Sequence, residues 1–434
     1  MIKRYIRQTW AFLKQNKLFG SLYIIGTAIP VALTMIVITF QYIRVGSIYP
    51  ENHRDELWVS ERAEYTSTAN GSYLTSQGGI SRRAVREWFY PLRQYGHVTA
   101  LRYLNDIFLQ LPDGKNMRLV KDIATDPDFF QVFNFEFVAG KPFTEADFQS
   151  SRYCTVITAS LAGQLFGNAT EAVGQTVRIN FTDYVITGVV RDASSLTPRA
   201  YAQIYTPYTC LKEAESFDPD NLCGIYTVCI RASENNGRQI QKEIEEHVRQ
   251  AQIKNNGERA FVETPYKSWR ANIVKNSGGG DEKLAKSLRI WGGLLIVFLL
   301  VPALNLSGMI AGRMEWRLPE MGICKAFGAT RRYLLRQVLG ENLVLTLMGG
   351  CLGLLISWGI LVWGRHWVFD FFSPGFYIFT ENTDNVLLMG EMLFSPWIFL
   401  SAFLVCAVLN VVSALIPAWN ALRTQIVYSL NQKK

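Results

Sequence analysis

The chain has 434 residues, of which 49% are hydrophobic and 18% are charged. This is too apolar for a wholly soluble protein, while a mean hydropathy of +0.08 is too low for a chain that lies entirely in a membrane. The formal net charge of +8 would permit nucleic-acid binding, but the basic residues cluster beside apolar runs and no helix-turn-helix or zinc-finger pattern stands out. We therefore expect membrane segments joined to a polar part, and no nucleic-acid partner.

The N-terminal part predicts a surface helix followed by a membrane span. Residues 1–17 contain five Arg or Lys and no acid, and their apolar residues recur at helical spacing, which favours a cytoplasmic amphipathic helix on membrane lipid. Residues 18–43 carry no charge and are long enough to cross the roughly 30 Å of hydrocarbon. A cleaved signal peptide is the alternative, but the run is too long for an h-region and no A-x-A site follows.

Residues 44–286 form a polar block that we expect outside the cytoplasm, as one large domain or two small ones. Its middle predicts mixed α and β structure, with a strand at 155–158, a helix at 159–166 and a hairpin at 176–190 that turns at Thr182-Asp183. Two further segments close the block. Residues 237–252 predict an amphipathic surface helix, and the glycine run 277–280 is either a flexible joint or an ordinary loop.

Three further apolar runs predict spans two to four, at residues 287–312, 342–364 and 393–422. The outer loop 365–392 has seven aromatic residues, which suit the membrane interface or could line a path for an apolar substrate. The tail 423–434 is basic. The predicted fold is therefore a four-helix membrane protein with a large α+β extracytoplasmic domain between helices 1 and 2. Both termini are then cytoplasmic, and the chain is a multi-pass membrane protein.

Small and polar residues within the spans predict helix packing. Gly349 and Gly353 form a small-xxx-small pair, which lets two helix backbones approach closely. Asn305 places a polar group in lipid, where it must find a partner, and Gly308 follows three residues later. We expect these four residues to pack helices rather than to bind a ligand.

Residues 313–341 form a basic segment between two apolar runs. It contains six Arg or Lys against two acids before its last residue, so the positive-inside rule places it in the cytoplasm. Pro319 and Glu320 suit the first turn of a helix, and Gly328 suits the position just after its end. We predict a helix of about nine residues, roughly 13 Å long, and a second helix capped by Thr330. A loop that only carries charge for topology is the alternative.

The residue types along this segment resemble the motif of the MacB/FtsX-type ABC transporter permeases. The resemblance rests on Asn305-Leu-Ser307-Gly308, Glu320-Met-Gly322-Ile-Cys-Lys325-Ala326-Phe-Gly328-Ala329, Arg331, Gln337 and Glu341-Asn342. The outer block is similar to the extracytoplasmic core domain of the same family at Phe129-Phe130, Gly140-Lys-Pro-Phe143, 156–160, 165–167, 173–174 and 184–190. Cys324 departs from the pattern, because the family commonly has a basic residue there.

The resemblance implies a coupling helix that docks on a separate ATP-hydrolysing subunit. The residues that it assigns to docking are Pro319, Glu320, Gly322, Lys325, Ala326, Gly328 and Arg331. It also implies a second permease chain, identical or paralogous, that meets this one through the first two spans. A periplasmic adaptor and an outer-membrane channel are further partners that the resemblance allows. Within the outer block it implies one subdomain built from both flanks and a second inserted between them.

The sequence has no pattern for catalysis. No G-x-x-x-x-G-K-[ST], G-x-S-x-G or H-E-x-x-H motif occurs, so we expect ATP and Mg²⁺ to be bound by the partner subunit and this chain to be a non-enzymatic subunit without a cofactor. The four histidines are scattered and predict no metal site. Of the seven cysteines, Cys210 and Cys223 are the pair that we expect to form a disulfide in an oxidising compartment.

Two functions remain open. The first is a permease that couples ATP hydrolysis in a separate subunit to movement of its outer domain, for export or extraction of a hydrophobic, peptide or lipoprotein cargo. The second is an FtsX-like signalling or scaffold protein that controls an extracytoplasmic partner and transports nothing. With the apolar run of the second span taken from Ile290 to Gly312, the predicted spans contain no charged residue, which favours cargo handled outside the bilayer or drawn from its outer leaflet.

Overall fold

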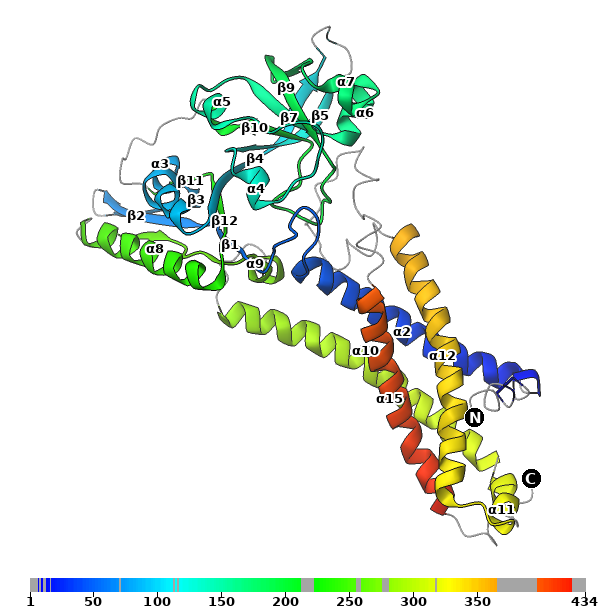
Figure 1. Cartoon of the computed structure of the whole chain (residues 1–434). Helices are drawn as coiled ribbons and strands as arrows, with labels where there is room; N and C mark the ends of the chain where they lie inside the picture. Colours follow the sequence, from blue (N-terminus) through cyan, green and yellow to red (C-terminus); the bar gives the residue numbers. More distant parts are fainter. Residues whose placement is uncertain are drawn as a thin grey trace. The chain divides into compact units, whose positions relative to one another are not determined.

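The computed structural model describes most of the chain. The residues outside the description are 1–6, 8, 11–12, 16, 70–71, 112–113, 115–116, 212–221, 255–258, 275–280, 317, 365–395 and 424–434. Most of the predicted N-terminal helix, the glycine run, the outer loop and nearly all of the tail therefore lie outside the described residues. The chain divides into two compact units, one mainly helical and one built from Ile43–Ser287 (Figure 1).

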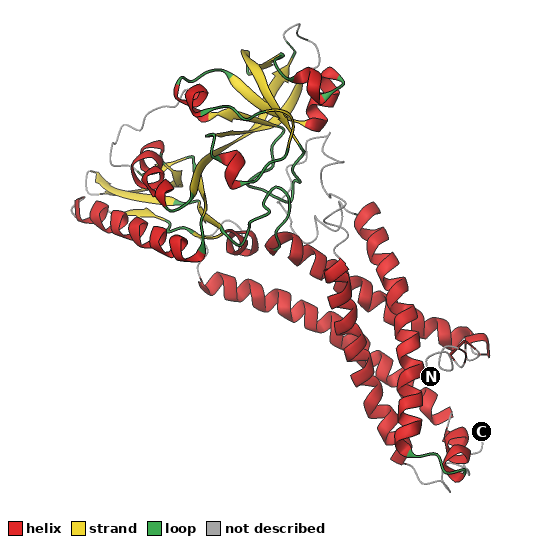
Figure 2. Cartoon of the chain, viewed as in Figure 1, coloured by secondary structure: helices red, strands yellow, loops and turns green. Residues whose placement is uncertain are grey.

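The second unit is an α+β domain (Figure 2), and its described strands form two sheets. Among the described residues the larger sheet has the strand order β14-β1-β12-β4-β5-β10-β7-β9-β6, and β8 pairs with both β4 and β9. Its strands are β1 (Leu57–Ser60), β4 (His97–Gln110), β5 (Arg118–Thr125), β6 (Phe137–Gly140), β7 (Cys154–Thr158), β8 (Thr176–Ile179), β9 (Thr182–Val190), β10 (Ile204–Pro207), β12 (Thr227–Arg231) and β14 (Tyr266–Lys267). The smaller sheet has the order β11-β3-β2-β13, from Cys223–Gly224, Ser72–Ile80, Ala63–Ala69 and Arg259–Val262.

The long strand β4 joins two lobes. Its first half, His97 to Leu101, pairs with β12, and its second half, Arg102 to Leu109, pairs with β5. The first lobe is therefore built from the segments that come before and after the inserted lobe in the chain. The inserted lobe contains the strands from β5 to β10. This is the arrangement that the family resemblance implies, and the boundary lies inside β4.

Short helices cover the sheets, and one long helix lies in the first lobe. They are α3 (Arg82–Ala84), η1 (Val85–Phe89), η2 (Tyr90–Gln94), α4 (Phe129–Val132), α5 (Glu145–Gln149), α6 (Ala159–Phe166), α7 (Ala169–Ala172), η3 (Tyr208–Cys210), α8 (Glu234–Lys254) and α9 (Ser268–Val274). The predicted helix at 159–166 is confirmed. The predicted amphipathic helix is also confirmed as part of α8, which buries Ile240 and Ile244 fully in the core of the first lobe.

The predicted hairpin is confirmed as β8 and β9, but the predicted position of its turn is wrong. Ile179 pairs with Thr182, so the two-residue turn is Asn180-Phe181, with φ angles of 43° and 67°. A two-residue hairpin turn of this kind needs positive φ at both central residues, and asparagine accepts that conformation more readily than most residues. Thr182 and Asp183 therefore belong to the strand.

The predicted disulfide between Cys210 and Cys223 is absent. Neither residue forms a disulfide, and their Sγ atoms lie 3.3 Å from different backbone oxygens, those of Arg152 and Ser76. The reason is that the two cysteines pack in different parts of the domain. Cys210 lies against the core of the inserted lobe and Cys223 against the core of the first lobe.

The helical unit contains the membrane candidates. Its helices are α2 (Lys17–Val45), α10 (Asp281–Trp316), α11 (Leu318–Ala326), α12 (Arg331–Trp363) and α15 (Pro396–Arg423). Among the described residues, two helical stretches are long and apolar enough to cross a membrane, Gly20–Val45 and Arg331–Trp363. They fall on the first and third predicted spans. Helices α10 and α15 lie over the second and fourth, and the number of four spans stays a prediction.

Candidate functional site

The loop between α10 and α12 contains a short helix, α11, with nine residues. Its end has the geometry of a Schellman cap. The N–H of Gly328 donates to the oxygen of Lys325 at 3.0 Å, and the N–H of Ala329 donates to the oxygen of Cys324 at 3.0 Å. Gly328 has a φ of +89°, the left-handed conformation that this cap requires at the residue after the helix. The predicted end of the helix is confirmed.

The N-cap of the next helix, Thr330 of α12, lies only two residues after Gly328. The hydroxyl of Thr330 accepts a hydrogen bond from the N–H of Tyr333 at 3.3 Å, and its backbone is extended, as in an N-cap. The predicted cap is confirmed. Because two capped helix ends meet across Gly328 and Thr330, the direction of α11 relative to α12 is set by local backbone geometry.

One side of this loop packs on the helical unit. Ala329 lies against a cluster of buried side chains that includes Met314 of α10 and Leu334 and Val338 of α12. The same cluster contains Tyr23 of α2 and two alanines of α15. The loop is therefore supported by residues from every long helix of this unit that the structure describes.

The other side of α11 exposes apolar side chains. Phe327 is 88% exposed and Ile323 is 50% exposed. Arg331 and Arg332 are exposed beside them, and partial burial followed by the charge of Arg331 lowers the pKa of Lys325. Aromatic residues and arginine are among the residue types that are enriched where proteins contact one another.

The structure places the predicted docking residues on this short segment. Gly322 is buried, while Ala326 and Gly328 are exposed. The backbones of Pro319 and Glu320 lie in the first turn of α11, as predicted, but their side chains lie outside the described residues. Sequence reasoning did not single out Phe327 or Ile323. An aromatic residue at the end of a predicted helix was the available signal.

The glycines of α12 lie at close helix contacts within the helical unit. A Cβ at Gly353 would stand 2.5 Å from the oxygen of Ala28 and 2.9 Å from Cβ of Val31, and Gly349 contacts Thr27 in the same way. Gly308 of α10 is different, because it is exposed and no described residue beyond its own helical turn has an atom within 4 Å of where its Cβ would be. The side chain of Asn305 lies outside the description.

No group of three or more His, Cys, Asp or Glu residues that could hold a metal ion occurs in the part of the chain that the structure describes. The loop around α11 offers caps, exposed apolar groups and positive charge. Apolar and cationic groups of this kind are suited to contact with another molecule.

Comparison with known proteins agrees with a membrane permease that carries an α+β domain. The family model of the MacB-like periplasmic core domain matches residues 23–247, and that of the FtsX-like permease C-terminal domain matches residues 292–426. The chain belongs to the MacB/FtsX-like family of ABC transporter permeases.

Named relatives are distant. The macrolide export ATP-binding/permease protein MacB of Agrobacterium fabrum is 26% identical over 70% of this chain and 42% of its own length. The uncharacterized ABC transporter permease YknZ of Bacillus subtilis is 27% identical over 53% of this chain and 54% of its own length. The chain thus spans about half, or less, of these relatives. A crystal structure of the periplasmic region of MacB from Actinobacillus actinomycetemcomitans is 15% identical, with coverage of 51% and 94% and a TM-score of 0.32.

Proposed function

We propose that this chain is the permease subunit of an ABC transporter and couples ATP hydrolysis by a separate subunit to movement of its α+β domain. In this proposal the chain crosses a bacterial inner membrane four times, both termini and the α11 loop face the cytoplasm, and the α+β domain lies outside. Two permease chains act together, and the partner subunit binds ATP and Mg²⁺. A periplasmic adaptor and an outer-membrane channel would complete an efflux assembly.

The observation that carries the proposal is the exposed surface of α11. Ile323 lies on α11 and Phe327 directly follows it, both are exposed, and a Schellman cap fixes the end of this helix. An exposed aromatic side chain on a rigid support gives a binding partner a large contact area at little entropic cost. We infer that α11 docks in a groove of the ATPase subunit.

The cargo is proposed at the level of chemical class only. The names of two relatives speak of macrolide export and pyoverdine export, which supports export over the FtsX-like alternative without transport. We propose a hydrophobic, peptide or lipoprotein cargo that is handled by the outer domain. The alternative predicts ATP-driven movement of the outer domain with no cargo that stimulates ATP hydrolysis.

Phe327→Ala tests the docking surface. We expect the variant to reduce co-purification of the ATPase subunit at least fivefold, because the side chain is 88% exposed and supplies contact area to the partner rather than to its own fold. The control is Tyr333→Ala, which removes an aromatic side chain that is 46% exposed nearby on α12. Parental co-purification of Phe327→Ala, or an equal loss in the control, would contradict the assignment of α11.

A further inference from the structure

The end of α2 accepts hydrogen bonds from buried and half-buried polar side chains of the α+β domain. The helix is continuous from Lys17 to Val45, and its residues from Ile43 onward belong to the same compact unit as the α+β domain. The last carbonyl groups of a helix lack partners within the helix and carry partial negative charge. Gly46, which follows, does not take the left-handed conformation of a glycine cap. Side chains meet these carbonyls instead.

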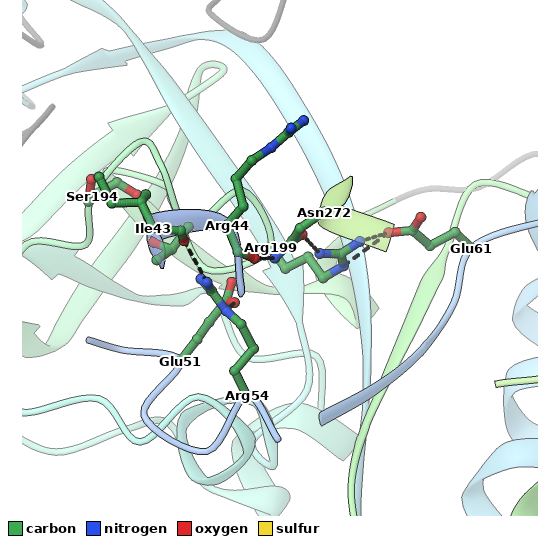
Figure 3. A network of polar contacts seen from close by, with 9 residues as sticks. Ile43, Arg44, Glu51, Arg54, Glu61, Ser194, Arg199 and Asn272 are labelled. Carbon is green, nitrogen blue, oxygen red and sulfur yellow. Dashed lines mark hydrogen bonds and ion pairs between the residues drawn. The ribbon is translucent and has the colours of Figure 1, made fainter. Parts of the chain in front are cut away.

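Arg54 meets the first of them. Its Nη1 donates to the oxygen of Ile43 at 2.6 Å, and its Nε donates to the carboxylate of Glu51 at 2.7 Å (Figure 3). The side chains of both Arg54 and Glu51 are 0% exposed. A buried guanidinium needs a carboxylate and further acceptors to offset its lost hydration, and here the helix end is one of those acceptors.

Asn272 meets the second carbonyl. Its Nδ2 donates to the oxygen of Arg44 at 3.0 Å, and its Oδ1 accepts from Nη1 of Arg199 at 2.6 Å. Asn272 lies on α9, the helix that precedes α10 in the chain. The point where the chain leaves α2 is therefore hydrogen-bonded to the segment through which the chain returns to the helical unit.

Arg199 connects this contact to both lobes. It lies between β9 and β10, and its Nε and Nη2 donate to Oε1 of Glu61 at 3.0 and 2.5 Å, as Figure 3 shows. Glu61 follows β1 of the first lobe, and its other oxygen accepts from the hydroxyl of Tyr266 at 3.3 Å. The Arg199 side chain is only 6% exposed. One hydrogen-bonded chain of residues thus joins the end of α2, α9 and the two lobes.

We propose that these five residues, Glu51, Arg54, Glu61, Arg199 and Asn272, form an α2 anchor that makes the α+β domain follow the motion of α2. This inference rests on the proposed function and names the positioning residues for it. Charge-assisted hydrogen bonds in a buried site are short and directional, so a tilt or rotation of α2 is not absorbed by bending at its last turn. A solvated helix end would fray, and the motion of α2 would then not be transmitted to the α+β domain.

The first experiment is hydrogen exchange on the full-length chain without nucleotide. Asn272→Ala removes both contacts of the central amide, and we expect exchange of the amides at residues 42–46 to rise at least tenfold, with β7 and β9 unchanged. The control is Tyr90→Phe, which removes a hydroxyl that donates to Asp126 at 2.8 Å elsewhere in the domain. Parental exchange at 42–46 in Asn272→Ala, or an equal rise in Tyr90→Phe, would overturn the anchor.

The second experiment separates coupling from simple stability. With the partner ATPase bound, the parent should show a nucleotide-dependent change of exchange in the α+β domain, and Asn272→Ala should lose at least half of it while ATP hydrolysis stays within twofold. A full nucleotide-dependent change in a variant whose α2 end exchanges faster would overturn the coupling role. A parent that shows no such change contradicts the proposed function and the coupling role together. The first experiment alone still decides whether the anchor holds the helix end.

Discussion

Gly328 is the residue whose backbone conformation ends α11. Its φ is +89° and nothing lies within 4 Å of where a Cβ would be, so a larger residue meets backbone strain and no steric clash. We expect Gly328→Val to cost about 1–2 kcal/mol in the stability of this turn and to reduce ATPase-subunit binding several-fold. Gly328→Asn is the matched control, because asparagine tolerates the left-handed conformation.

We would measure the loss of binding as the yield of the complex with the ATPase subunit and as the rate of ATP hydrolysis by that complex. Membrane insertion and the fold of the α+β domain should be unchanged in both variants. Equal and parental values for Gly328→Val would mean that the loop serves topology alone.

Asp122 is a buried acid in the core of the inserted lobe. It is 3% exposed, its carboxylate accepts from the hydroxyl of Thr206 at 2.7 Å, and burial raises its pKa from 3.8 to about 7 despite that hydrogen bond. A raised pKa means that the folded state binds the proton more tightly than the unfolded state. The contribution of Asp122 to stability therefore falls as pH rises from about 4 to about 7 and is constant above that range.

Asp122→Asn should remove this dependence. We expect the variant to gain stability relative to the parent between pH 5 and pH 8, by on the order of 2 kcal/mol or more, at about 1.4 kcal/mol per pKa unit. The measurement is thermal unfolding of the α+β domain in the full chain at several pH values. Identical pH profiles of parent and variant would show that Asp122 does not titrate in this range.

At the scale of elements, α12 packs against α2 through glycines. Gly353 has no room for a Cβ, whereas Gly359 on the same helix has nothing within 4 Å of that position. We expect Gly353→Ala to destabilise the helical unit by about 1–3 kcal/mol, because the two backbones must separate. Gly359→Ala should be neutral or stabilising by up to about 1 kcal/mol, because alanine favours a helix. Thermal unfolding in detergent compares the two, and equal shifts would contradict the close contact.

At the scale of the whole assembly, α10 leaves apolar side chains exposed. Ile290, Ile296 and Leu300 are each more than half exposed in the single chain, and Gly308 lies free of neighbours farther along the helix. We expect two permease chains in the complex with the ATPase, with contacts through the first two spans. Native mass measurement counts the chains, and a complex with one permease chain would contradict the dimer.

A substitution at Gly308 tests which helix makes that contact. Gly308→Leu adds bulk where the single chain has space, so it should leave the fold intact and reduce the fraction of complexes with two permease chains. Gly359→Leu adds the same bulk at an equally open position on α12 and should not change that fraction. A lower fraction of two-chain complexes in both variants would indicate a general effect of a larger side chain in the membrane.

Features with local causes were predicted well from the sequence. The end of α11 depends on Gly328, and the start of α12 on Thr330, and both conformations follow from residues within one helical turn. The helix at 159–166 and the hairpin partners of 176–190 were found for the same reason. The turn itself was misplaced, because alternation of polarity does not identify which two residues take positive φ.

The sequence by itself determined the apolar runs, the basic loop with its two caps, and the alternating pattern of the outer domain, because each depends on side chains that are close along the chain. Only the tertiary structure decided which distant segments meet. The lobe boundary inside β4 depends on pairing with β5 and β12, and the α2 anchor joins Arg44 to Asn272 across 228 positions. The periodicity of apolar residues along the chain does not indicate which strand pairs with which, or which residue pairs with a buried charge. Tertiary packing also determines the separation of Cys210 from Cys223 and the exposure of Phe327.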